Sequence, residues 1–150
     1  MQVPLKPFLR RAYVELLKST QERISVSDVA EKCGVSRNAF YYQYDGMPDL
    51  IQDTVMDWLN TKHPEVFRIP SLWVCYQTVL DYAEENLPIA LHICTAINWR
   101  MMMRTLALLG QKIRQRYEEV QGASSSQGDF YEHAFMGAAL AWLGEKGVFN

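Results

Sequence analysis

The chain has 150 residues, of which 49% are hydrophobic and 21% are charged, and its net charge at pH 7 is −2. This balance excludes a uniformly basic nucleic-acid-binding protein, so any contact with DNA must come from a local patch. The sequence has no apolar run of the ~20 residues that span a bilayer and no secretory signal pattern. Its three cysteines are widely spaced. Together these features predict a cytoplasmic protein without disulfides.

Apolar residues recur at helical spacing almost throughout the chain, and no alternating run of Val, Ile or Thr indicates a strand. The first helix is expected over residues 5–19, with Phe8 on its apolar face. The second helix begins after Ser25, which can form a capping box with Asp28, and ends at Gly34. Both ends of this second helix are therefore marked by local sequence.

The third helix is expected over residues 37–44, and the fourth opens at Pro48, because proline is tolerated in a first helical turn. Residues 61–70 contain two prolines and predict a junction between subdomains. Residues 1–44 carry seven basic and four acidic side chains, whereas the rest of the chain carries eight basic and thirteen acidic ones. The sequence thus predicts a mildly basic N-terminal segment and an acidic remainder, which suits a DNA-binding head on a body that does not bind DNA. We expect the head over residues 1–60 and the body over residues 61–150.

The body is predicted to be helical as well. Its helices are expected over residues 71–86, 89–96, 98–120 and 130–145, with a flexible loop at 122–128. The expected fold is therefore all-α, with an N-terminal three-helix head and a C-terminal helical bundle.

The most informative stretch runs from Ile24 to Leu50. It contains two short predicted helices joined by Gly34-Val35-Ser36, and Ala30 is small where the two helices would approach closely. This layout is that of a helix-turn-helix, in which the second helix enters the major groove of DNA. We expect Phe40 and Tyr44 to face the core. The remaining side chains of that helix are then free to reach phosphates and base edges.

The same stretch resembles the DNA-binding head of the TetR/AcrR family of transcriptional regulators. The matching residues are Ile24, Ala30, Gly34-Val35-Ser36, Phe40-Tyr41, Tyr44 and Asp49-Leu50. The resemblance implies DNA contacts at Ser27, Ser36, Arg37, Asn38, Ala39, Tyr41, Tyr42, Gln43 and, at the start of the fourth helix, Met47.

One of these positions departs from the family pattern. The family has a lysine where this chain has Met47. The backbone N–H groups at the start of the fourth helix could still bind a phosphate, so the departure should weaken DNA binding without abolishing it. It also leaves open a second interpretation, a TetR-like protein that has lost DNA binding and works through protein partners. Repression is the usual activity of the family.

The resemblance also implies an effector pocket and a homodimer that binds a palindromic operator. A small apolar or aromatic effector would contact Trp73, Tyr76, Trp99, Met102 and Met103, although such stripes are more often plain core. Small residues in the last helix favour close helix packing. The dimer interface is expected at Phe135, Gly137, Ala138, Ala141 and Trp142.

Other classes of function find little support in the sequence. The histidines and cysteines lack the spacing of a metal site, and no nucleophile elbow, P-loop or dinucleotide-binding loop is present. We therefore expect neither an enzyme nor a cofactor or metal. A thiol sensor at Cys75 or Cys94 stays open, and it would require a lowered thiol pKa.

Overall fold

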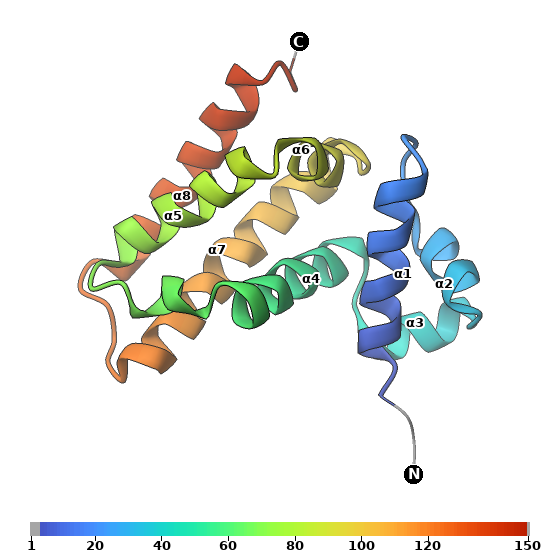
Figure 1. The fold of residues 1–150 in the computed structure, drawn as a ribbon, viewed down its shortest axis with the longest axis horizontal. Coiled ribbons are helices and arrows are strands. Elements are labelled where there is room, and N and C mark those ends of the chain that lie inside the picture. Colours follow the sequence, from blue (N-terminus) through green and yellow to red (C-terminus); the bar gives the residue numbers. More distant parts are fainter. Residues whose placement is uncertain (1–3, 150) are drawn as a thin grey trace.

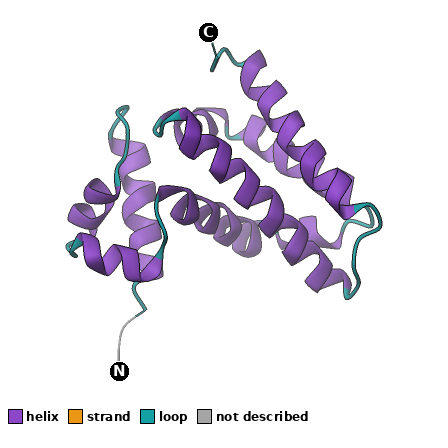
Figure 2. Ribbon diagram, turned by 180° about the vertical axis from the view of Figure 1, so that it is seen from behind, coloured by secondary structure: helices purple, strands orange, loops and turns teal. Residues whose placement is uncertain are grey.

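The computed structural model describes residues 4–149, which form α-helices and one 3-10 helix and contain no β-strand within that range. Figure 2 shows only helices and loops in the described chain. The predicted all-α class is therefore confirmed. The elements are α1 (Lys6–Ser19), α2 (Val26–Cys33), α3 (Arg37–Gln43), α4 (Met47–Lys62), η1 (Pro64–Arg68), α5 (Leu72–Glu85), α6 (Leu87–Thr95), α7 (Trp99–Gln121) and α8 (Gly128–Glu145).

The helices α1, α2 and α3 gather at one end of the molecule, and α4 leads from them into the rest of the structure (Figure 1). There α4 packs along α7, which in turn packs against α8 and α5. Among the described residues, no helix has both the length and the apolar character required to cross a bilayer. We refer below to α1–α3 as the head and to α5–α8 as the body, with α4 belonging to both.

The segment predicted as a junction, residues 61–70, is not a linker. The division expected at residue 60 falls inside the last turn of α4, and η1 follows almost at once. In η1, Val66 and Phe67 are 0% and 1% exposed, because they pack into the core beside α5 and α7. The two prolines shape this short helix and do not separate two independent units.

The largest apolar cluster runs across the expected boundary between head and body. Leu9 of α1 and Phe40 of α3 belong to the same cluster as Leu106 of α7 and Leu143 of α8. Two hydrogen bonds also join the two parts: the Ile24 N–H donates to the Ala96 carbonyl at 2.9 Å, and the His92 ring contacts the Leu17 carbonyl at 2.9 Å. The head is thus docked on the body through a shared core.

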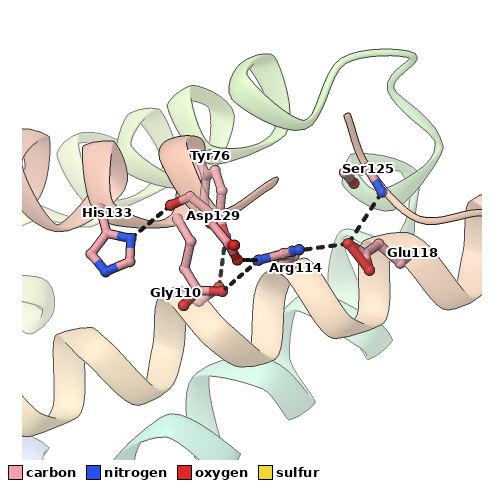
Figure 3. A network of polar contacts seen from close by, with 8 residues as sticks. Tyr76, Gly110, Arg114, Glu118, Ser125, Asp129 and His133 are labelled. Atoms are coloured by element: carbon pink, nitrogen blue, oxygen red, sulfur yellow. Dashed lines mark hydrogen bonds and ion pairs between the residues drawn. The ribbon is translucent and has the colours of Figure 1, made fainter. Parts of the chain in front are cut away.

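A polar network fixes the loop that precedes α8, which the sequence predicted to be flexible (Figure 3). Arg114 of α7 pairs with Glu118 at 2.9 Å and with Asp129 of α8. The Ser125 N–H donates to the same Glu118 carboxylate at 3.2 Å. Gly128 leaves room for this network, because a Cβ at that position would lie 2.5 Å from Arg114 Nε and would displace the Arg114 side chain.

Two aromatic residues, one expected on an apolar helix face and one expected in the effector pocket, are largely exposed. Phe8 is 44% exposed and Trp99 is 55% exposed. In α1 the neighbouring Leu9 occupies the buried position, because α2, α4 and α6 cover only one side of that helix. Helical spacing alone could not decide between two adjacent apolar residues, since both lie near the same stripe.

Candidate nucleic-acid interface

The α2–turn–α3 unit, residues 25–44, is stabilised locally by the caps expected from the sequence. The Asp28 N–H donates to Ser25 Oγ at 3.1 Å, and the Ser25 N–H donates to Asp28 Oδ2 at 2.8 Å, which completes the capping box. Gly34 ends α2 with φ of 77°, a left-handed conformation that glycine adopts without strain. Ser36 then caps α3 by accepting a hydrogen bond from the Ala39 N–H at 3.1 Å.

The short helix α3 has one buried and one exposed face. Phe40 is fully buried and Tyr44, its C-cap residue, is 2% exposed, as the sequence predicted. On the opposite face Arg37 and Asn38 are exposed, and the Tyr42 side chain is 87% exposed. An exposed fraction this large is unusual for tyrosine, because the transfer of its ring out of water is favourable. The exposed face carries hydrogen-bond donors of several kinds and no carboxylate.

Most residues predicted to contact DNA are accessible from this side. Ser27, Ser36 and Tyr41 are exposed, whereas Ala39 and Gln43 are half-buried. The Ser36 hydroxyl is already engaged as a cap, so it helps to position α3. These residues, together with Arg37, Asn38 and Tyr42, all come from α2, α3 and the turn between them.

Met47 is the exception, and here the prediction of a contact residue is wrong for the side chain. Met47 is 2% exposed and belongs to the apolar cluster that head and body share. The physical reason is that burial of the apolar Met47 side chain stabilises the folded protein, whereas a lysine would keep its ammonium group in water. The first turn of α4 also contains Pro48, which has no N–H, and the Asp49 carboxylate.

The structure brings a cation to this place that sequence reasoning missed. Lys6 at the start of α1 lies over the Tyr44 ring, with its Nζ 5.1 Å from the ring centre. It lines a polar depression together with Asp49 and Gln52 of α4. Its side chain is exposed. No sequence pattern indicated that Lys6 would lie near the start of α4, because this placement depends on how α1 packs in the folded head.

A partly buried polar anchor holds α1, α3 and α4 together beneath the exposed face. Arg10 of α1 pairs with Asp53 of α4 at 3.0 Å, and the Tyr44 hydroxyl donates to the same carboxylate. Burial, and then the hydrogen bond to Asp53, raise the pKa of Tyr44 well above its usual range. The phenol therefore stays protonated and continues to donate to Asp53 at any ordinary pH.

The apolar effector residues expected from the sequence do not form one site. A cavity of about 380 Å³ lies between α1 and α4 on one side and α5–α8 on the other, but of the five only Met102 lines it. Trp73 stacks on Tyr131, and Trp99 contacts Phe149 edge-to-face. Tyr76 is buried in the core beside α8, and Met103 lies outside the cavity wall. These residues sit on helix faces that point in different directions.

The residues predicted for a dimer interface also separate into two groups. Phe135 is 2% exposed and stacks on Tyr76, so it cannot reach a partner and this prediction is wrong. Trp142 is half-buried, and its indole N–H donates to Glu84 of α5 at 2.9 Å. The remaining three residues lie nearer the surface, where Gly137 and Ala141 are exposed and Ala138 is half-buried.

The cysteines lack the electrostatic surroundings of a reactive thiol. Burial raises the pKa of Cys75 to about 12 and that of Cys94 to about 11. A sensor thiol requires the opposite shift, so the structure speaks against that open alternative. Within the described part of the chain, no three His, Cys, Asp or Glu side chains gather in a metal-binding arrangement.

Comparisons with protein-family models, with curated proteins and with solved structures found no match to this chain. The assignment of a function therefore depends on the residues and on the geometry described above.

Proposed function

We propose that this protein is a DNA-binding transcriptional regulator of the TetR type, which acts as a repressor and reads DNA with α3. The observation that carries the proposal is the exposed face of α3. It presents the Arg37 guanidinium, the Asn38 amide and the Tyr42 phenol, on a helix whose opposite face is fixed in the core. Arginine pairs with guanine and asparagine with adenine in the major groove, while tyrosine hydroxyls reach phosphates.

The electrostatics of the head support the same proposal. Lys6 lies next to the first turn of α4, where the family places a lysine and this chain has the buried Met47. A phosphate near this turn would meet the Lys6 ammonium, which takes over the role of the missing side chain. The acidic body, by contrast, is unsuited to a general affinity for nucleic acid.

The regulator is proposed to bind a palindromic operator as a homodimer. The outer side of α8 supports this step, because Phe130, Ala134, Gly137, Ala141 and Gly144 recur at a spacing that places them in one stripe. Phe130 is 67% exposed, and a Cβ built on Gly137 would meet no atom within 4 Å. Two such stripes can pack closely against each other, with Gly137 and Ala141 at the contact.

The decisive experiment is a salt titration of binding to DNA from upstream of the gene, with random duplex as competitor and fluorescence anisotropy as the readout. We expect selective binding that weakens steeply as salt increases. Arg37→Ala should reduce the affinity by about tenfold or more, because a base contact contributes roughly 1–3 kcal/mol. Arg68→Ala in η1 is the matched control, since it also removes one exposed arginine.

Two results would decide against the proposal. If the protein does not select its upstream DNA over random duplex even at low salt, it acts through protein partners, the alternative raised by the departure from the family pattern at Met47. If Arg37→Ala and Arg68→Ala weaken binding equally, the contact with DNA is not made by α3.

A further inference from the structure

The cavity between head and body has an almost wholly apolar wall, and the two lining residues that are exposed to solvent are polar. Its buried lining residues are Leu17, Ile51, Leu59, Val79, Ile97, Met102, Thr105, Leu106, Phe135, Ala139 and Leu143. Among all the residues that line it, only Lys18 and Asn86 are exposed. A molecule in the cavity would therefore meet mainly hydrocarbon, with Lys18 and Asn86 at the exposed edge that we call its opening.

The threonine, tyrosine and tryptophan side chains of the wall include four whose donors are already engaged in hydrogen bonds. Thr54 and Thr105 donate to carbonyls of the preceding helical turn at 2.8 and 2.7 Å. Tyr82 and Trp142 donate to the carboxylates of Glu65 and Glu84, which do not line the cavity. Because these groups have no free donor to offer, a polar ligand body would lose its own hydrogen bonds with water on entering. The interior therefore suits a hydrocarbon.

The opening selects the charge of the ligand. Lys18 is the only charged residue in the wall, and among the described residues its ammonium has no ion-pair partner. No carboxylate lines the cavity, so a cationic ligand would meet repulsion and nothing to offset it. An anionic head at the opening would instead lie near Lys18 while remaining in contact with water.

We propose that this cavity binds an amphiphile with a hydrocarbon body and a single carboxylate head, with its tail among the buried residues and its head at Lys18. The cavity volume of about 380 Å³ lies within the range of sites for small organic ligands. A ligand seated here would touch α1 and α4 as well as α5–α8. Only the regulatory consequence, altered DNA binding, rests on the function proposed above.

The four tryptophans allow a direct test in the full-length protein. Trp58 and Trp142 line the cavity, whereas Trp73 and Trp99 do not. A Trp73→Phe/Trp99→Phe double variant therefore retains tryptophan fluorescence only where a ligand would bind. We would titrate it at pH 7 with three probes of equal chain length: decanoate, 1-decanol and decylamine. Decanoate should bind most tightly, and its Kd should be about tenfold lower than that of decylamine, since the charge at the opening changes from attractive to repulsive.

Two further variants in the same background locate the head and the tail. Lys18→Met should weaken decanoate binding by about threefold, the effect of one exposed ion pair, and leave 1-decanol binding unchanged. Ala139→Phe should fill the cavity and weaken all three probes, and Val55→Phe serves the same purpose if the buried α8 position does not tolerate the ring. Ala107→Phe on the exposed side of α7 is the control, and its binding should match the parent.

The proposal is overturned if decylamine binds as tightly as decanoate, if Lys18→Met leaves decanoate binding unchanged, or if no probe alters the fluorescence of Trp58 and Trp142. The titration contains no DNA, so a failure of the proposed regulatory function does not affect it. A protein that binds its operator but none of the probes would overturn this inference alone.

Discussion

The outer faces of α3 and α8 are both helix surfaces that no other part of the described chain covers, yet their chemistry is opposite. On α3 the exposed residues are Arg37, Asn38, Tyr41 and Tyr42, which offer hydrogen bonds. On α8 they include Gly137 and Ala141, which offer almost none. A surface of donors can exchange water for a polyanion, whereas a small apolar surface gains only when a close-fitting surface covers it. The two faces are therefore suited to two different partners.

The comparison predicts that each face can be disabled while the other continues to function. The largest effect is expected at α8. Ala141→Arg should weaken dimer formation by about a hundredfold, because an unpaired charge in a packed interface costs roughly 3 kcal/mol. Sedimentation velocity would measure the change. Gln77→Arg is the matched control, because it places the same charge at an exposed position of α5. An unchanged dimer would mean that the interface lies elsewhere.

The next effect is expected at the anchor beneath α3. Asp53→Ala leaves Arg10 and the Tyr44 hydroxyl without their common partner, and should lower the free energy of unfolding by about 1–3 kcal/mol. Asp57→Ala is the control, because Asp57 lies 3.6 Å from the same arginine and is 47% exposed. Urea denaturation would measure both. If the two variants are equally stable, Asp53 is not the residue that holds α3.

A smaller effect on the α3 face is expected from Lys6. Lys6→Ala should weaken operator binding by about threefold and reduce the slope of log affinity against log salt by about one, as expected for one lost phosphate contact. Lys62→Ala at the far end of α4 removes an equally exposed lysine and should leave the slope unchanged. A slope unaffected by Lys6→Ala would mean that this residue does not replace the lysine absent at Met47.

The smallest effect concerns the network that fixes the start of α8. Hydrogen bonds from Arg114 hold the pKa values of Glu118 and Asp129 below their ordinary ranges. A lowered pKa in the folded protein stabilises it above the unfolded pKa of about 4, and this stabilisation disappears as the pH falls through the folded value. Between about pH 5 and pH 3 the melting temperature should therefore fall further for the parent than for Arg114→Gln. Arg116→Gln, at an exposed pair, should follow the parent.

The local architecture of the head could be predicted from sequence because short-range rules govern it. The capping box of Ser25 and Asp28, the left-handed Gly34 and the Ser36 cap each involve residues within a few positions of one another. The inward direction of Phe40 follows from helix periodicity. These features together define which side of α3 is left in water.

Longer-range features could not be predicted in the same way. The sequence showed that Met47 departs from a family pattern, but only the tertiary structure shows that it is buried and that Lys6 lies nearby. The aromatic and methionine residues expected to form one pocket point in different directions. The cavity is instead lined largely by aliphatic residues from six helices, which have no common spacing in sequence.

Sequence by itself determined that the chain is helical, where most helices begin and end, and which residues α3 exposes. Hydrogen bonds and caps within one helix decide where it begins and ends, and the helical periodicity of apolar residues decides which side it buries. The tertiary structure alone decided that head and body share a core, that Phe135 faces inward and that a hydrocarbon cavity opens beside Lys18. These depend on which helix faces meet, and that is set by packing between residues far apart in the chain.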